Sequence, residues 1–149
     1  MNSRVSQSTP TAQPLLRLQP RRTSEIRVLI VDDEESVRLF VDRVLRSAGY
    51  QTALAPDGPS ALQIASTPDR VDLLLTDLMM PGMKGDELAR QLRVTTPSLK
   101  VLYFTGFSEL LFAERSTLWE DEVFLDKPAT ASGLLQAVLQ LLNSGQTST

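Results

Sequence analysis

One short segment restricts the possible folds of this chain more than any other. Residues 71–75 (Val-Asp-Leu-Leu-Leu) are almost all apolar and show no alternation of apolar and polar side chains. This pattern is typical of a strand buried on both faces, as in a parallel sheet covered by helices. A single carboxylate, Asp77, follows, and Pro81-Gly82 then ends any extended structure. Because ligands bind beyond the carboxyl ends of parallel strands, Asp77 is a candidate site residue, although an aspartate here can equally cap the next element.

The rest of the chain alternates between predicted strands and predicted helices. Apolar and β-branched runs predict strands at residues 26–31, 50–55, 71–75, 99–104 and 122–125. Apolar residues at three- and four-residue spacing after each strand indicate helices. The predicted helices are one with Val37, Val41, Val44, Leu45 and Ala48 that ends at Gly49, one with Ala61, Leu62, Ile64 and Ala65, one that opens at Asp86-Glu87 and has Leu88, Leu92 and Val94 on its inner face, one over residues 108–118, and one over residues 131–143 that buries Leu134, Leu135, Val138, Leu141 and Leu142.

This alternation predicts an α/β fold, a doubly wound parallel sheet of five strands with helices on both faces. We expect one domain over residues 25–144, with no second domain and no internal repeat. Residues 1–24 are rich in Ser, Thr, Gln and Pro and predict a disordered tail or linker. Residues 145–149 predict a disordered C-terminus.

Composition excludes several classes of function. The chain has no cysteine and no histidine, which excludes disulfides, thiolate or histidine metal sites, histidine-based triads and a phosphohistidine of its own. It has neither a bilayer-spanning apolar run nor a signal-peptide pattern, so we expect a cytoplasmic protein without membrane contact. Residues 1–25 hold four arginines and one glutamate, and the remainder holds 11 basic and 17 acidic side chains. An acidic body argues against nucleic-acid binding.

Polar side chains follow four of the predicted strands. They are Asp32-Asp33 after the first, Asp77 after the third, Thr105 after the fourth and Lys127 after the fifth. A right-handed doubly wound sheet places these strand ends along one edge. Helix capping would explain one or two of the carboxylates, but a pair at a strand end repels unless a cation is bound. Clustered carboxylates suit Mg²⁺, while a lysine and a threonine suit phosphoryl oxygens. The sequence therefore predicts an acyl-phosphate site.

With these motifs, the chain resembles the receiver domain of the response-regulator family of two-component signalling. The resemblance covers about residues 26–143 and implies a flavodoxin-like sheet of order 2-1-3-4-5. It implies that Asp77 is phosphorylated with Mg²⁺ by a histidine kinase or histidine phosphotransfer protein, and that the domain is a switch and no enzyme. The motifs are Val31-Asp32-Asp33-Glu34, Thr76-Asp77-Leu78-Met79-Met80-Pro81-Gly82-Met83, Tyr103-Phe104-Thr105-Gly106 and Leu125-Asp126-Lys127-Pro128.

The resemblance also implies a role for each site residue. Asp33, Asp77 and the Met79 carbonyl oxygen would bind Mg²⁺ directly, and Asp32 would act mostly through a metal-bound water. Thr105 and Lys127 would contact the phosphoryl group. Gly106 would leave space for the donor imidazole, and the Lys127-Pro128 peptide would be cis.

Some positions depart from the commonest family pattern. Phe124 stands at a switching aromatic position and has no hydroxyl, and Ala129 stands where a bulky aromatic is usual. Both leave the output mechanism open. Met79 and Phe107 occupy the positions that influence the attacking water in receivers. Since both are apolar, we expect slow hydrolysis of the aspartyl phosphate.

Other classes of protein fit less well. A haloacid-dehalogenase-like phosphatase would need Asp-x-Asp after the first strand, where this chain has Asp32-Asp33-Glu34. A flavin-binding flavodoxin would need a phosphate loop there, which carboxylates would repel. A phosphorylation-independent pseudo-receiver and a receiver fragment of a hybrid histidine kinase stay open as alternatives. The complete set of acids, threonine and lysine argues against the pseudo-receiver.

The sequence also bears on self-association. Residues 128–149 carry no charged side chain and leave no room for a DNA-binding domain after the last helix. The last helix therefore has no charge to contribute to intermolecular salt bridges. We expect a monomer or a weak dimer that lacks such bridges, and an apolar surface that docks on an output partner of unknown identity.

Overall fold

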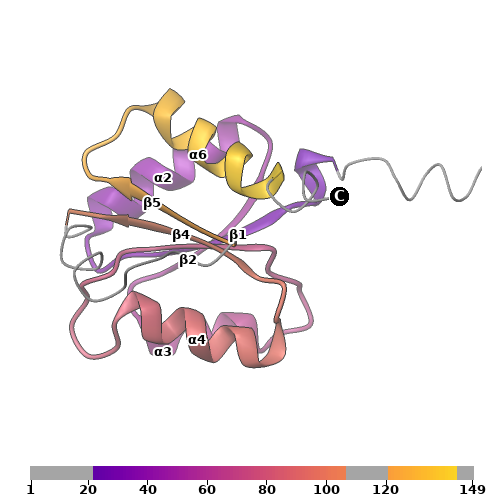
Figure 1. Ribbon diagram of the computed structural model, residues 1–149, viewed down its shortest axis with the longest axis vertical. Coiled ribbons are helices and arrows are strands. Elements are labelled where there is room, and N and C mark those ends of the chain that lie inside the picture. The colour runs from indigo at the N-terminus through magenta and orange to yellow at the C-terminus, as the bar shows by residue number, and fades with distance from the viewer. Residues whose placement is uncertain (1–21, 107–120, 144–149) are drawn as a thin grey trace, which may run out of the picture.

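All five predicted strands form, and they pair into one parallel sheet. The computed structural model describes residues 22–106 and 121–143, and the strand order is β2-β1-β3-β4-β5 (Figure 1). This order confirms the predicted flavodoxin-like fold. The strands are β1 (Arg27–Val31), β2 (Gln51–Ala55), β3 (Leu73–Thr76), β4 (Lys100–Thr105) and β5 (Glu122–Asp126). The helices are η1 (Thr23–Glu25), α2 (Glu35–Ser47), α3 (Gly58–Ala65), α4 (Gly85–Thr95) and α6 (Ala131–Asn143).

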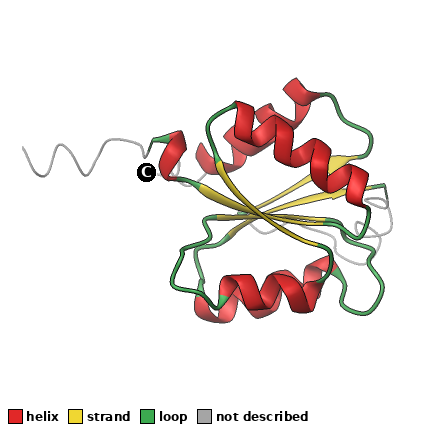
Figure 2. Ribbon diagram, turned by 180° about the vertical axis from the view of Figure 1, so that it is seen from behind, coloured by secondary structure: helices red, strands yellow, loops and turns green. Residues whose placement is uncertain are grey.

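Helices cover both faces of the sheet, as the apolar strands predict. The helices α2 and α6 pack on one face and α3 and α4 on the other (Figure 2). Side chains along β1 point alternately to the two layers, so that Val28 and Ile30 face α2 and α6 while Leu29 and Val31 face α3 and α4. Since β1 is wholly buried beyond its first residue, it has no solvent face where polar side chains could be placed.

Two details of the predicted helices are wrong. Val94 is 79% exposed, because the buried stripe of α4 runs through Leu88, Ala89 and Leu92 and Val94 lies on the opposite side. In α6 the buried positions are Leu134, Ala137, Val138 and Leu141, while Leu135 and Leu142 flank this stripe and are half-buried. The predicted helix over residues 108–118 lies outside the described residues.

The predicted end of the first helix is confirmed. Gly49 adopts φ 98°, a left-handed conformation that favours glycine after a helix. None of the described helices is long and apolar enough to cross a bilayer.

A buried ion pair joins α4 to β5 at the end of the sheet where the strands begin. Arg93 Nη1 lies 2.9 Å from Glu122 Oε2, and the Tyr103 hydroxyl donates to the same oxygen at 3.2 Å. The Arg93 guanidinium also donates to the Leu99 carbonyl. The Glu122 side chain is only 2% exposed, so its charge depends on these donors and has little access to water.

We expect Arg93→Met to destabilise the fold strongly, because it removes the guanidinium that lies 2.9 Å from the buried Glu122 carboxylate. The free energy of unfolding should fall by about 3 kcal/mol in a urea titration. Arg46→Met is the matched control, since the Arg46 side chain is 69% exposed and pairs with Asp42 at 3.8 Å. That variant should lose less than about 0.5 kcal/mol. Equal losses in both variants would contradict this account.

Candidate functional site

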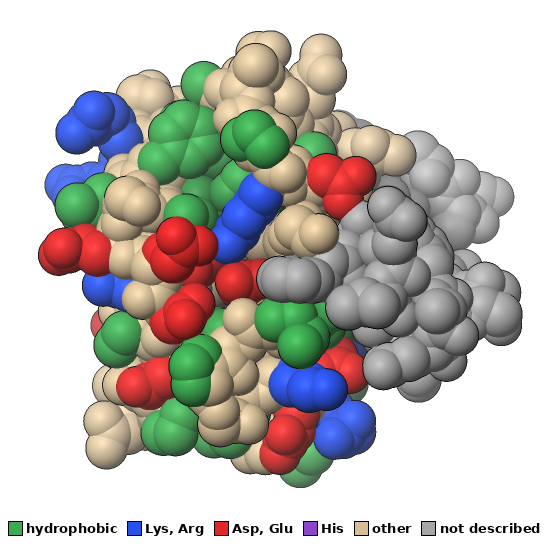
Figure 3. All heavy atoms as spheres, turned by 90° about the vertical axis from the view of Figure 1, so that its left-hand side faces the viewer, with side chains coloured by type: hydrophobic (Ala, Val, Ile, Leu, Met, Phe, Trp, Pro, Cys, Tyr) green, Lys and Arg blue, Asp and Glu red, His purple; other side chains and the backbone are tan. Residues whose placement is uncertain are grey.

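The strand register brings the predicted site residues to one edge of the sheet. Val31 lies level with Thr76 in the β1–β3 ladder, so the residues that follow them, Asp32 and Asp77, are neighbours. The Asp77 N–H donates to the Val31 carbonyl at 3.0 Å, and the Lys127 N–H donates to the Thr105 carbonyl at 3.1 Å. The backbone hydrogen bonds of the sheet thus continue one residue past β3 and β5, and they fix the backbone of Asp77 and Lys127. On this face, acidic side chains gather beside a basic one (Figure 3).

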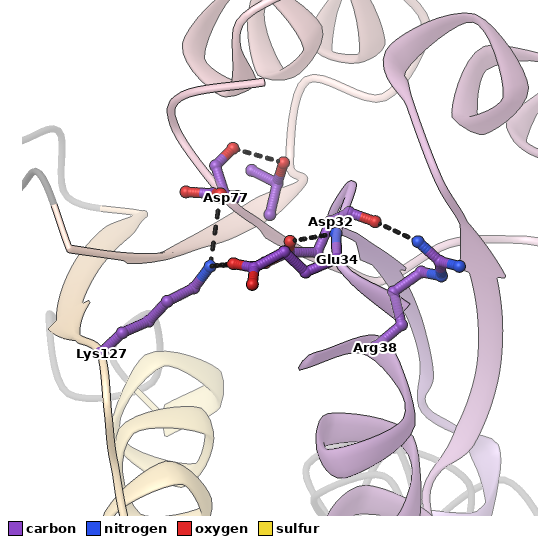
Figure 4. A network of polar contacts seen from close by, with 6 residues as sticks. Asp32, Glu34, Arg38, Asp77 and Lys127 are labelled. Carbon is purple, nitrogen blue, oxygen red and sulfur yellow. Dashed lines mark hydrogen bonds and ion pairs between the residues drawn. The ribbon is translucent and has the colours of Figure 1, made fainter. Parts of the chain in front are cut away.

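The Lys127 ammonium group bridges the two buried aspartates. Its Nζ lies 2.8 Å from Asp32 Oδ2 and 3.3 Å from Asp77 Oδ2, with the more exposed Glu34 carboxylate at 3.8 Å (Figure 4). Asp32 is 2% exposed and Asp77 is 6% exposed. One cation from the end of β5 therefore ties together the ends of β1 and β3.

Burial and charge act in opposite directions on these groups. Burial raises the pKa of the Asp32 carboxyl above its usual value, although Lys127 and the Glu34 N–H both favour the charged form. Burial by itself lowers the pKa of Lys127, but the hydrogen bonds and negative charges of Asp32 and Asp77 outweigh it, so that the pKa of Lys127 is raised. Lys127 is thus a permanent positive charge at neutral pH.

The carboxylates form a set that suits a hard divalent cation. Oxygens of Asp32, Asp33 and Asp77 all lie within 4.8 Å of one another. Asp77 Oδ1 is buried and accepts no hydrogen bond from any residue that the structure describes. Since Mg²⁺ prefers carboxylate and carbonyl oxygens, the donor set fits this ion. A buried oxygen without a donor needs a partner from outside the described chain.

The other predicted site residues lie around this cluster. Thr105 is fully buried at the end of β4, and Met79 is 37% exposed in the loop after β3. A Cβ atom added at Gly106 would meet no atom of the described residues within 4 Å, in keeping with the predicted space beside the site. Phe124 packs on Tyr103 with 5.0 Å between ring centroids. The Lys127-Pro128 peptide is cis, as predicted. Phe107 lies outside the described residues.

Two residues near the site were missed by sequence reasoning. Gly85 opens α4 against the backbone of Asp77, where a Cβ would overlap the Asp77 carbonyl. The isolated glycine ahead of Asp86 was the available signal. Arg38 donates from Nη1 to the Asp32 carbonyl at 2.6 Å. No sequence pattern distinguishes it from the other arginines of α2.

Comparison with known proteins shows the family. The response regulator receiver domain family matches residues 28–139. The response regulator receiver protein CpdR of Brucella abortus is 33% identical over 116 residues, which are 78% of this chain and 96% of that protein. The sensor kinase CckA of the same organism is 36% identical over 116 residues, and the chain spans only 12% of that protein's length.

The fold comparison agrees. A response regulator receiver protein from Sinorhizobium medicae superposes with a TM-score of 0.70 at 28% identity, over 79% of this chain and 94% of that one. The chain belongs to the response regulator receiver family. Domains of this family are phosphoacceptors of two-component signalling that bind Mg²⁺ at an acidic pocket and interact with histidine kinases or phosphotransfer proteins.

We expect Asp33→Ala to weaken Mg²⁺ binding measured by calorimetry. Loss of a residue that only supports a metal ligand already lowers metal affinity roughly tenfold. Since Asp33→Ala would remove a direct ligand, the affinity should fall at least that much. Metal-free protein should unfold at the same or a higher temperature, because one of three repelling carboxylates is gone. Glu35→Ala, which removes an exposed acid outside the cluster, should leave Mg²⁺ affinity unchanged. Unchanged affinity in Asp33→Ala would exclude Asp33 as a ligand.

Proposed function

We propose that this member of the receiver family accepts a phosphoryl group on Asp77 from a phosphohistidine of a partner protein and thereby switches a protein–protein interaction. The observation that carries the proposal is the state of the Asp77 carboxylate. It is buried at a strand end, its Oδ2 lies 3.3 Å from the Lys127 ammonium, and no described residue donates to its Oδ1. This oxygen is therefore the one free to attack a phosphorus atom.

The transfer forms one bond and breaks another. An Asp77 oxygen attacks the phosphorus, the new P–O bond forms, and the P–N bond to the donor imidazole breaks. The imidazole nitrogen keeps the electron pair of that bond and takes up a proton. Mg²⁺ would supply charge neutralisation at the phosphoryl oxygens. We propose that Asp33, Asp77 and the Met79 carbonyl oxygen hold it directly, with Asp32 acting mostly through water.

Lys127 and Thr105 complete the proposed chemistry. The Lys127 ammonium already lies 3.3 Å from Oδ2 of the same carboxylate, so it can pair with an oxygen of a phosphoryl group on Oδ1 without a large movement. The Thr105 hydroxyl, at the end of the adjacent strand, would donate to another oxygen. Lys127 would thus place a positive charge, and Thr105 a hydrogen-bond donor, where negative charge accumulates on the phosphoryl oxygens.

We place the receiver domain at residues 25–144, which enclose the family match over residues 28–139. CpdR is matched over 96% of its length and the CckA kinase over 12% of its length, so similar domains occur in proteins of very different size. We therefore propose only a protein as the output partner. Self-association through a surface without salt bridges stays our prediction.

Acetyl phosphate provides the direct test of this proposal. With Mg²⁺, intact-mass spectrometry should show one added phosphoryl group, and Asp77→Asn should abolish it. Asp69→Asn is the control, because Asp69 is 67% exposed and pairs with Arg27 at the far end of the sheet. It should be labelled like the wild type. Continued labelling of Asp77→Asn would refute the assignment, and absence of labelling in the wild type would favour a pseudo-receiver.

The lifetime of the phosphoryl group gives a further prediction. Met79 is apolar and partly exposed beside the site, so it cannot orient a water molecule for attack. Met79→Asn adds a donor and an acceptor worth about 1 kcal/mol, which corresponds to roughly fivefold faster hydrolysis. Val94→Asn, at an exposed apolar position on α4, is the control and should not change the rate. An unchanged lifetime in Met79→Asn would show that the side chain at position 79 does not control the orientation of the attacking water.

A further inference from the structure

We propose that Arg38 is a positioning residue for the divalent metal ion. Its guanidinium holds the Asp32 carbonyl and thereby sets the course of the backbone into Asp33. The inference rests on the proposed metal site and assigns to it a side chain that touches neither the ion nor the phosphoryl group. It follows from how Asp32, Asp33 and Arg38 are held.

Each polar group of Asp32 has a partner. Its N–H donates to the Ala55 carbonyl at 3.3 Å, its Oδ1 accepts from the Glu34 N–H at 2.9 Å, and its Oδ2 accepts from Lys127. The carbonyl oxygen accepts from Arg38 Nη1 at 2.6 Å. The carbonyl direction depends on the ψ angle of Asp32, which also determines where residue 33 begins. Among the described residues, Arg38 is the only side chain bonded to this carbonyl.

Asp33 has no comparable support of its own. It is exposed, and no described residue donates a hydrogen bond to its carboxylate. Its oxygen nevertheless lies within 4.8 Å of those of Asp32 and Asp77. The position of this ligand therefore depends on its backbone, and the peptide that leads into it is the one that Arg38 holds.

Arg38 is well placed for this task because it belongs to a regular helix. It lies in the first turns of α2, and its own N–H donates to the Glu34 carbonyl at 3.1 Å. Lys127 and Arg38 reach Asp32 from opposite sides, one to the carboxylate and the other to the backbone (Figure 4). Within residues 22–106 and 121–143, the Arg38 guanidinium forms no ion pair, and the hydrogen bond to the Asp32 carbonyl is the one polar contact of this side chain.

Positioning and simple electrostatics predict opposite results when Arg38 is replaced. A positive charge close to a cation site repels the cation, so removing that charge alone should tighten metal binding. Loss of a group that orients a ligand instead weakens metal binding, by roughly 10- to 100-fold where it has been measured for outer partners of metal ligands. The direction of the change in metal affinity therefore distinguishes a positioning role of Arg38 from a purely electrostatic one.

The test measures Mn²⁺ binding by the electron paramagnetic resonance signal of the free ion, with Mg²⁺ competition, on the full chain. We expect Arg38→Gln, whose shorter side chain loses the carbonyl contact, to raise the dissociation constant roughly tenfold. The matched control is Arg43→Gln, which removes the same charge from an exposed position on the same helix. It should bind as the wild type does. Arg38→Lys, which keeps a donor and the charge, should recover part of the affinity.

A second readout uses acetyl phosphate. In Arg38→Gln the Mg²⁺ concentration for half-maximal phosphorylation should rise about as much as the dissociation constant, while the rate at saturating Mg²⁺ stays near that of the wild type. Binding in Arg38→Gln that equals or exceeds that of Arg43→Gln would overturn the proposal. If circular dichroism shows that Arg38→Gln does not fold, the pair Arg38→Met and Arg43→Met decides in the same way.

The experiments distinguish an error in the role of Arg38 from an error in the proposed function. Asp33→Ala should weaken Mn²⁺ binding at least roughly tenfold, and unchanged binding in that variant would show that the proposed metal site itself is wrong. If Asp77 is not the acceptor, the phosphorylation readout fails while the Mn²⁺ readout still reports on Arg38.

Discussion

The arrangement of the site depends on one ammonium group between two buried carboxylates. Asp32 and Asp77 are almost inaccessible to solvent, and an isolated carboxylate in such a place would cost several kcal/mol. Lys127 contacts both of them and brings the end of β5 to the ends of β1 and β3. The cation compensates the acids only in part, since three clustered carboxylates face one lysine. That imbalance leaves the pocket attractive to a divalent cation.

The fold explains why charged groups lie at the ends of β1 and β3 and not along them. The strands β1 and β3 are packed on both faces by helices, so their interiors admit only apolar side chains. Charged residues are possible only where the strands begin or end. At the beginning, Arg93 and Glu122 neutralise each other and stabilise the packing of α4 on the sheet. At the end where the strands finish, three clustered carboxylates face one lysine. This excess of negative charge makes that edge of the sheet reactive.

Much of this could be predicted from the sequence because it follows from periodicity and chain order. Uninterrupted apolar runs identified the strands, and the residues after those runs identified Asp32, Asp77, Thr105 and Lys127. Predictions failed where position depends on three-dimensional detail. Val94 matched an apolar pattern but lies opposite the buried stripe of α4. The Arg93–Glu122 pair and the Arg38 contact join residues 29 and 6 positions apart through side chains whose direction no local pattern determines. The roles of the site residues stay predictions.

The distance along the chain between the acids and their lysine has a consequence for synthesis. Lys127 follows Asp77 by 50 positions and Asp32 by 95, so both aspartates leave the ribosome well before the cation does. An incomplete chain that ends ahead of β5 holds Asp77, the acceptor that we propose, without the ammonium group that contacts its carboxylate. The charged site is therefore complete only once β5 has paired with β4. Until then, the carboxylates at this edge of the sheet lack the cation that partly compensates them.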